Sequence, residues 1–482
     1  MTSLLAALPL LVAILGLALR LRALTASLLS VAVAVLLALT VFRTPAAAWY
    51  AGLAGLTPTV LEVLGVLFGG VLLNLVLNRT GAQTVIAAWV ERSCAGQRER
   101  AGLFMALGLT PFAESVTGYG LGAMIAIPLL RHLGFDRTRA LTLGLLGLFL
   151  TTWGALAPGA LVAAALGGVD VIALSVRSAE LAIVAIVLTG LTAQVLALGR
   201  RALRLTPLLD LLLMSAATWG VLIATNRLLG PPLAGVLGSL AATLVMLLRF
   251  RLAGARPGLD RVTARALLPY GVLVAGLLGC GVALRLTGAT GAWTLLGHGS
   301  LWLLVTCTVT LLRERTPLPQ VRQDLTAALL RWWPVGSATA GFLFLGAVLT
   351  LTGMSGQVAV GLSAAGAAYA FLSPFVGGLG GLVSGTAVGA NAMFAASQAE
   401  AAVRLGIPAL ELVSVQNLTA GVLTMAAPTR VALALVPAAA TSDTDDPADR
   451  LRTEVSLRWL IGLCLVILTC LGLLELALLL TR

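Results

Sequence analysis

The sequence predicts an all-α polytopic membrane protein with about twelve transmembrane helices and two re-entrant hairpins arranged as an inverted repeat. Hydrophobic residues make up 59% of the 482-residue chain and charged residues only 10%, whereas a soluble domain carries roughly 25% charged residues. Apolar stretches of about 20 residues, long enough to cross the hydrocarbon core of a bilayer, recur along the whole chain. Two further apolar stretches are dense in glycine and interrupted near their middle.

The charge pattern favours a multi-pass protein of the plasma (inner) membrane. All 31 basic residues are arginines, clustered between apolar stretches, as the positive-inside rule predicts. The net charge of +12 therefore indicates membrane orientation, and we expect no nucleic-acid partner. The five cysteines show no metal or redox spacing, so neither a metal site nor a cofactor is expected.

The N-terminal apolar stretch lacks a basic leader region and a cleavage site, so we interpret it as the first span and not as a signal peptide. The twelve predicted spans cover residues 4–19, 23–42, 58–78, 140–160, 178–198, 206–226, 231–248, 266–284, 294–312, 332–351, 408–428 and 455–478.

Residues 101–130 and 374–403 are the two interrupted stretches, with glycine-rich breaks at 110–122 and 377–389. Broken helices are tolerated at membrane depth only where protein or a water-filled cavity surrounds them. We therefore interpret both stretches as re-entrant hairpins. With each hairpin entering and leaving on one side, the termini lie outside and 25 of the 31 arginines lie inside.

The hairpins also indicate an internal repeat. Thr110-Pro111-Phe112 precedes the first break and Ser373-Pro374-Phe375 precedes the second, and each hairpin is followed by a span that contains a proline, Pro158 or Pro428. The hairpins enter from opposite sides, so the copies are inverted, and paired interrupted segments of this kind mark a transporter's binding site. The predicted domains are scaffold helices 1–57, a first repeat 58–230, connecting helices 231–330 and a second repeat 331–482.

A break at mid-membrane leaves unbonded N–H groups and a positive helix end, which suit a carboxylate ligand. The predicted substrate-binding residues lie at the two breaks and on the proline-containing spans: Ser115, Thr117, Gly118, Tyr119, Gly120, Thr152, Ser384, Gly385, Thr386, Asn391 and Asn417. Small residues also mediate helix packing in lipid, which is the alternative reading of each glycine cluster.

Glu114 is the predicted proton-coupling residue, because a carboxylate deep in a membrane protein is functional by default. It would either carry a proton or organise the hairpin tip by accepting backbone N–H groups. Arg430, just beyond Pro428, would either attract an anion or be an ordinary inner-face arginine. No catalytic residues are expected, because the acids and the two histidines do not cluster at one interface.

At these residues the sequence resembles the L-lactate permease family. Residues Phe112–Gly120 read F-A-E-S-V-T-G-Y-G, close to the family motif F-L-E-G-A-A-G-F-G. Residues 373–380, followed by 384–386 and 391–398, are similar to the family's second signature, S-P-F-x-G-x-L-G with a later G-S and A-L-F-A-A-L-Q. The span at 67–81 also matches, and the resemblance covers about residues 58–175 and 330–435.

The resemblance implies secondary uptake of lactate or a related 2-hydroxy monocarboxylate such as glycolate, coupled to H⁺. It also implies kinship with elevator-type ion transporters, which move a hairpin-bearing domain across a scaffold. The chain departs from the family at Thr386-Ala387-Val388, where the family usually has Ser-Asp-Thr or Ser-Asn-Thr, and at 424–428, which holds no lysine. We therefore expect an altered substrate preference.

The partners expected are a small organic anion, H⁺ and the lipid bilayer, with a homo-oligomer left open. The alternatives are a sodium-coupled organic-anion carrier and a polytopic membrane enzyme.

Overall fold

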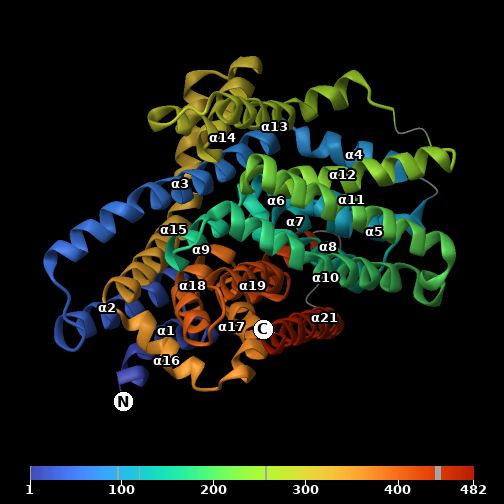
Figure 1. Cartoon of the computed structure of the whole chain (residues 1–482). Coiled ribbons are helices and arrows are strands. Elements are labelled where there is room, and N and C mark those ends of the chain that lie inside the picture. Colours follow the sequence, from blue (N-terminus) through green and yellow to red (C-terminus); the bar gives the residue numbers. More distant parts are fainter. Residues whose placement is uncertain (1, 95–96, 119, 256–257, 440–446, 482) are drawn as a thin grey trace.

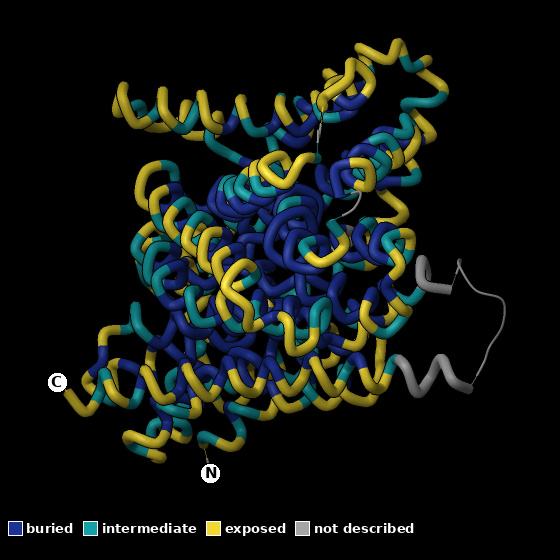
Figure 2. The backbone as a smooth tube through the Cα atoms, turned by 90° about the vertical axis from the view of Figure 1, so that its right-hand side faces the viewer, coloured by how far each residue is buried: buried dark blue, intermediate teal, exposed yellow. Residues whose placement is uncertain are grey.

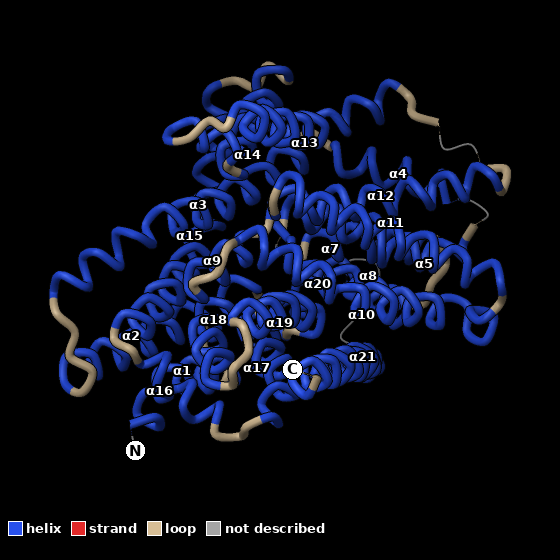
Figure 3. Tube along the Cα trace, in the orientation of Figure 1, coloured by secondary structure: helices blue, strands red, loops and turns tan. Residues whose placement is uncertain are grey.

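The computed structural model describes residues 2–94, 97–118, 120–255, 258–439 and 447–481. This part of the chain consists of helices joined by short loops and holds no strand (Figure 3). Within it, eleven helices are long and apolar enough to cross a membrane, or twelve if a helix pair bent by 59° at 291–313 counts as one span. The predicted all-α fold with about twelve spans is therefore confirmed.

The helix ends follow local sequence rules. Asp136, Asp170 and Asp260 each cap the helix that follows by accepting a backbone N–H, and Pro158 and Pro231 each occupy a first turn, where no N–H is needed. In chain order the α-helices are α1 (Thr2–Ala18), α2 (Ala23–Thr40), α3 (Ala46–Arg79), α4 (Ala82–Cys94), α5 (Arg98–Phe104), α6 (Thr110–Thr117), α7 (Leu121–His132), α8 (Arg137–Leu146), α9 (Pro158–Gly167), α10 (Val171–Leu198), α11 (Leu205–Leu229), α12 (Pro231–Leu252), α13 (Arg261–Thr287), α14 (Gly299–Arg313), α15 (Leu318–Leu351), α16 (Met354–Ser363), α17 (Ala367–Ser384), α18 (Ala387–Arg404), α19 (Ala409–Val422), α20 (Pro428–Ala439) and α21 (Pro447–Leu480). A π-helical turn and four 3₁₀ segments complete the chain: η1 (Met105–Leu109), η2 (Gly147–Leu156), η3 (Gly199–Leu203), η4 (Gly291–Gly297) and η5 (Leu423–Ala426).

Several spans are longer than predicted, and α3 and α15 exceed their predicted ranges by the most. Helices α3 and α15 each run for 34 residues and begin at 46 and 318, whereas the sequence predicted starts at 58 and 332. Pro58 and Pro334 lie inside these helices without ending them, which neighbouring helices make tolerable in a membrane protein. The sequence also missed α4, a 13-residue helix that follows α3.

The two predicted hairpins are each made of consecutive helices that pack on one another across a short break. The first contains α5, η1, α6 and α7, with its break at 118–120, and the second contains α17 and α18, with its break at Gly385 and Thr386. Helix α17 is itself long and apolar enough to cross a membrane. The re-entrant geometry of the hairpins therefore stays a prediction.

The long helices α3 and α15 pack against each other, and α15 connects two ends of the molecule. Figure 1 shows α13 and α14 at one end and α1, α2 and α16 at the other, with α6, α7, α9, α18 and α19 between them. Figure 2 shows that this central region is buried, while exposed residues lie on the outer helices. Many of the exposed side chains are leucines, such as Leu4 and Leu205, as expected of a surface that contacts lipid.

Ion pairs between helices agree with the predicted orientation. Asp210, which is 2% exposed, is held by Arg100 at 2.8 Å and by Arg249 at 2.6 Å, and the arginine pattern places all three near the inner face. Arg177 pairs with Glu411 at 2.7 Å, and both are predicted to lie near the outer face. These pairs join segments that the arginine pattern assigns to the same side.

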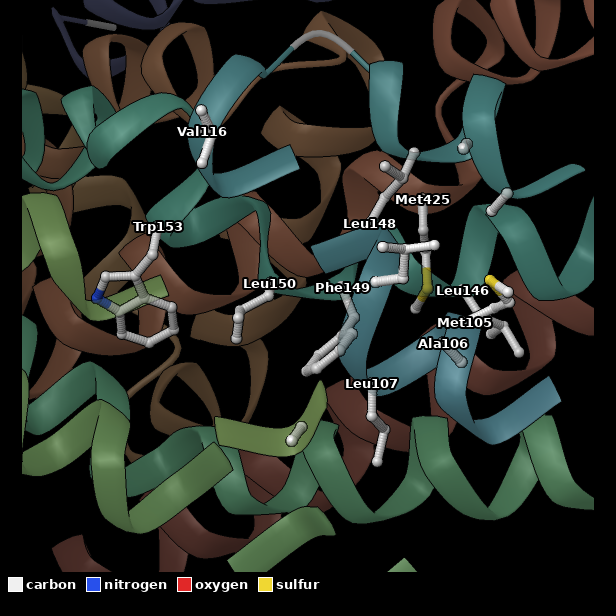
Figure 4. Packing of buried hydrophobic residues seen from close by; sticks show 14 of the residues in the cluster. Met105, Ala106, Leu107, Val116, Leu146, Leu148, Phe149, Leu150, Trp153 and Met425 are labelled. Carbon is white, nitrogen blue, oxygen red and sulfur yellow. The ribbon is translucent and has the colours of Figure 1, made fainter. Parts of the chain in front are cut away.

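The core beside the breaks is formed by large apolar side chains. Figure 4 shows Val116, Phe149, Trp153 and Met425 in the cluster that packs α6, η2 and η5 together. Trp153 is completely buried, and its indole N–H donates to Asn226 Oδ1 on α11 at 3.3 Å. The break-bearing segments are thus embedded in a packed interior and not at a lipid-facing surface.

Candidate functional site

Two irregular backbone segments touch at the first break. Gly118 (φ +72°, ψ −170°) and Gly120 (φ +79°, ψ +10°) separate α6 from α7, and Gly118 adopts a conformation that is essentially restricted to glycine. A Cβ on Gly118 would lie only 2.7 Å from the Cβ of Ala155. Ala155 belongs to a second irregular segment, Ala155–Ala157, in which three consecutive residues other than glycine have positive φ. Such strained backbone concentrates at functional sites.

Glu114 accepts hydrogen bonds from both sides of the first break. Its side chain is 1% exposed, and its two carboxylate oxygens accept the N–H of Gly120 at 3.0 and 2.9 Å. The N–H of Gly118 is bonded to the Glu114 carbonyl at 2.8 Å. One residue therefore supplies acceptors for both sides of the break.

Arg430 connects Glu114 to the second break. The arginine lies on α20, one turn beyond the point where η5 ends, and is 6% exposed. Its Nε donates to the carbonyl of Gly385 at 2.9 Å, and its Nη1 lies 3.4 Å from Glu114 Oε1. A guanidinium with its fixed fork of donors can serve both groups at once. The pair therefore holds the two breaks together with no net charge.

A cavity of about 40 Å³ lies at this junction. A water molecule takes about 30 Å³ of liquid volume, so the cavity holds one or two waters and is too small for an organic acid with five or six heavy atoms. The conformation described therefore leaves no room at the site for such a molecule. The lining comes from α3, both hairpins, η2, α9, α15 and α20, and consists of Leu67, Glu114, Gly118, Thr151, Gly154, Ala155, Pro158, Gly159, Thr339, Thr386, Ala387, Val388 and Arg430.

The second break supplies neutral groups. Thr386 caps α18 by accepting the N–H of Gly389 at 3.0 Å, which leaves the hydroxyl proton of Thr386 for the cavity that it lines. The Ser384 hydroxyl contacts the carbonyls of Gly380 at 2.7 Å and Thr386 at 2.9 Å. Ser384 thus shapes the turn, and Thr386 faces the site.

Some predicted residues point elsewhere. Ser115 packs toward Gly235 of α12, and its hydroxyl has no hydrogen-bond partner among the described residues. Thr117 donates to the Ala113 carbonyl at 2.6 Å, within its own helix. Thr152 donates to the Leu418 carbonyl at 3.1 Å and packs α19 against η2, while its neighbour Thr151 lines the cavity. Tyr119 lies outside the described residues.

Asn391 and Asn417 lie in a buried amide network behind the cavity. The Asn391 amide donates to Asn417 Oδ1 and to the carbonyl of Gly159, both at 3.0 Å, and Asn417 donates to Ser178 Oγ at 3.1 Å. Gln416 Nε2 lies 3.4 Å from Asn391 Oδ1. The network joins α18, α19 and α10 to the start of α9, and so it positions the lining residues without belonging to the lining.

Among the lining residues that carry polar groups, sequence reasoning left out Thr339 and left the role of Arg430 open. Arg430 had a usable signal, since it lies two residues after the proline of the second broken span. Thr339 had none, because it lies within the regular helix α15.

Charged and polar groups that converge on breaks between helices inside a helical membrane protein are the arrangement typical of a membrane transporter. The sequence profile of the L-lactate permease family matches residues 2–257 and 287–476, so the chain belongs to this family and is a multi-pass protein of the cell membrane. An 84-residue stretch is 42% identical to the L-lactate permease of Escherichia coli K12, and a stretch of the same length is 38% identical to that of Salmonella typhi. Each stretch covers 17% of this chain and only 15% of the relative.

Proposed function

We propose that the protein is a secondary active transporter that carries lactate, or a related small 2-hydroxy monocarboxylate such as glycolate, together with a proton. The observation that carries the proposal is the buried Glu114–Arg430 pair at the cavity between the two breaks. Family membership supports the substrate class, since the relatives in Escherichia coli and Salmonella typhi are L-lactate permeases.

Charge balance explains how the pair would couple the substrate to a proton. Glu114 and Arg430 together carry no net charge, and both are buried. A carboxylate that binds Arg430 adds a negative charge at low dielectric, which is costly unless it is compensated. A proton on Glu114 compensates this charge and weakens the contact between Glu114 and Arg430 Nη1, so that this nitrogen can donate to the substrate. The site therefore binds the substrate and the proton together, or binds neither of them.

The neutral groups would select the substrate. Thr386 offers a hydroxyl proton, and the N–H groups at the start of α18 offer a positive helix end. A 2-hydroxy acid presents its hydroxyl oxygen next to its carboxylate, so Thr386 is placed to bind the hydroxyl while Arg430 binds the carboxylate. Thr386 stands where the family has a serine followed by aspartate, and this change supports an altered preference among short acids.

The proposal includes an inverted repeat, which reciprocal contacts support. Helix α9 packs on α18 as α20 packs on α7, α2 packs on α15 as α14 packs on α3, and α1 packs on α16 as α13 packs on α4. Two copies of one unit related by a two-fold axis would make such contacts in pairs. They favour copies that span about 2–198 and 261–480, longer than the repeats that the sequence predicted at 58–230 and 331–482.

In this scheme α1–α4 and α13–α16 form the scaffold, and the two hairpins with α8–α10 and α19–α21 form the part that moves. Helices α11 and α12, which lie in or beside the predicted connecting region 231–330, pack on α10, α6 and η2. They therefore belong with the moving part. An elevator-type movement of this part would expose the site to one side of the membrane at a time.

The test is uptake of labelled lactate, glycolate and acetate into proteoliposomes under an inward proton gradient or an inward sodium gradient at equal pH. We expect proton-driven accumulation of lactate or glycolate, with acetate a weaker substrate because it lacks the hydroxyl. Protein-free liposomes are the control. Uptake that is driven by sodium and insensitive to pH would show that the coupling ion is Na⁺ and not H⁺. The absence of uptake of any short carboxylate would refute the proposal.

A further inference from the structure

A second cavity, of about 400 Å³, lies behind the first hairpin. Residues of α4, α6, α7, α12 and α13 form its walls. It has room for roughly a dozen groups the size of a water molecule. None of the residues that line the cavity between the breaks lines this one, so the two cavities are separate.

The walls of this second cavity are apolar. Three aromatic side chains, Trp89, Phe112 and Tyr270, lie among leucines and isoleucines, and the ring centroids of Phe112 and Tyr270 are 5.7 Å apart. Leu244 and Leu248 of α12 line the cavity and are each 57% exposed at the surface of the protein. The cavity therefore opens sideways, toward the lipid that surrounds the helices.

Two polar side chains, one at the rim of this cavity and one buried within it, lack partners among the described residues. Arg251, in the last turn of α12, is exposed and lines the cavity, and its guanidinium makes no ion pair or hydrogen bond among the described residues. The Tyr270 hydroxyl likewise has no hydrogen-bond partner in the described part of the chain. An apolar cavity with one unpaired positive charge at its rim matches an amphiphile with an anionic head.

We propose that this cavity binds an anionic phospholipid of the bilayer, with an acyl chain in the apolar cavity and the phosphate on Arg251. The arginine pattern predicts that residue 251 lies at the inner face, where arginines are attracted to anionic lipids. The lateral opening between exposed leucines gives the acyl chain a route from the bilayer, which a soluble ligand would not need.

The lipid would lie against the segment that bears the coupling residue. Phe112 and Ala113 line the cavity and directly precede Glu114, and α12 packs on both α6 and η2. A bound acyl chain therefore supports the back of the first hairpin. An acyl chain that fills the cavity would stabilise the position of the hairpin, and this effect does not depend on which substrate is transported.

Delipidated, purified full-length protein provides the test. Phosphatidylglycerol and phosphatidylcholine with the same acyl chains are added separately, and thermal stability and lipid retention by native mass spectrometry are measured. We expect the anionic lipid to bind at least fivefold more tightly and to raise the melting temperature more. Soluble glycerol phosphate should leave the melting temperature unchanged; a shift as large as that of the lipid would overturn the acyl-chain assignment.

Two variants separate the head from the chain. Arg251→Gln should reduce the preference for phosphatidylglycerol at least threefold, whereas Arg322→Gln, at an exposed inner-face arginine of α15, should leave it unchanged. Leu247→Trp should fill the cavity and reduce binding of both lipids. Equal binding of the two lipids by the wild type, or an unchanged preference in Arg251→Gln, overturns the proposal, even if Leu247→Trp does not fold. A folded Leu247→Trp that binds lipid like the wild type would also overturn it.

Discussion

The two breaks at the centre of the protein are closed by different chemistry. At the first, the carboxylate of Glu114 accepts the N–H of Gly120 with both oxygens, at 3.0 and 2.9 Å. At the second, the hydroxyls of Ser384 and Thr386 contact neighbouring backbone groups, and the nearest charge comes from Arg430, which donates to the Gly385 carbonyl at 2.9 Å. The first break thus contains a charged side chain of its own hairpin, Glu114, whereas the charged group at the second break is Arg430 of α20.

Under the proposed function, this difference predicts different tasks for the two breaks. Arg430 bonds to the second break and lies 3.4 Å from Glu114. A change in the charge of Glu114 would therefore alter the contacts of Arg430 and, through them, the second break. The first break is therefore suited to proton coupling, and the neutral second break is suited to discriminating between substrates. Variants at the two breaks should consequently fail in different ways.

The largest effect should follow from Arg430→Gln. The change removes the link between the breaks and leaves the buried Glu114 carboxylate without its cation, which costs about 3–5 kcal/mol for a buried ion pair. We expect uptake to fall more than 100-fold and the melting temperature to drop. Arg404→Gln, at an exposed arginine, is the control. Uptake within twofold of the wild type in Arg430→Gln would show that the link is dispensable.

A smaller effect on stability should follow from Gly118→Ala. An alanine there would take an unfavourable backbone conformation and would bring its Cβ to 2.7 Å from that of Ala155. We expect a loss of about 1–3 kcal/mol for the overpacking, in addition to the backbone strain. The matched control is Gly168→Ala, where φ is +63° and no atom lies within 4 Å of the added Cβ. Equal melting temperatures of the two variants would contradict the tight contact between the irregular segments.

The smallest effect should follow from Thr386→Ala, at the second break. Losing the cap of α18 costs about 1 kcal/mol, and losing the hydroxyl proton should raise the KM for 2-hydroxy acids more than that for acetate. Thr386→Ser keeps the hydroxyl and should restore both properties. If the variant lowers uptake of acetate and lactate equally, Thr386 acts on the turn alone and does not read the substrate.

The sequence predicted the local features of the site and missed those that depend on packing. Glycine and proline act on their own stretch of chain, so the breaks at 118–120 and 385–386 and the prolines after them could be predicted. Arg430 meets Glu114 across 316 residues, and no local pattern reports such a contact.

The predicted and observed lining residues also differ where two polar residues are adjacent on one helix. Successive side chains point about 100° apart, so Glu114 and Ser115 cannot both face one small cavity. Glu114 lines it, while Ser115 packs toward Gly235. The same holds for the neighbours Thr151 and Thr152, of which only Thr151 lines the cavity. Residue type predicted which segments carry polar side chains. Which of these side chains faces the cavity depends on the rotation of the helix about its axis, and tertiary packing sets that rotation.

The most direct test of the coupling role of the Glu114–Arg430 pair is proton-driven accumulation of labelled lactate or glycolate by Glu114→Gln in proteoliposomes. Glutamine keeps an acceptor for Gly120 but carries no titratable charge. The account predicts that the wild type concentrates the substrate when a proton gradient is imposed, and that the variant at most equilibrates it across the membrane. Accumulation by the variant equal to that of the wild type would contradict the account.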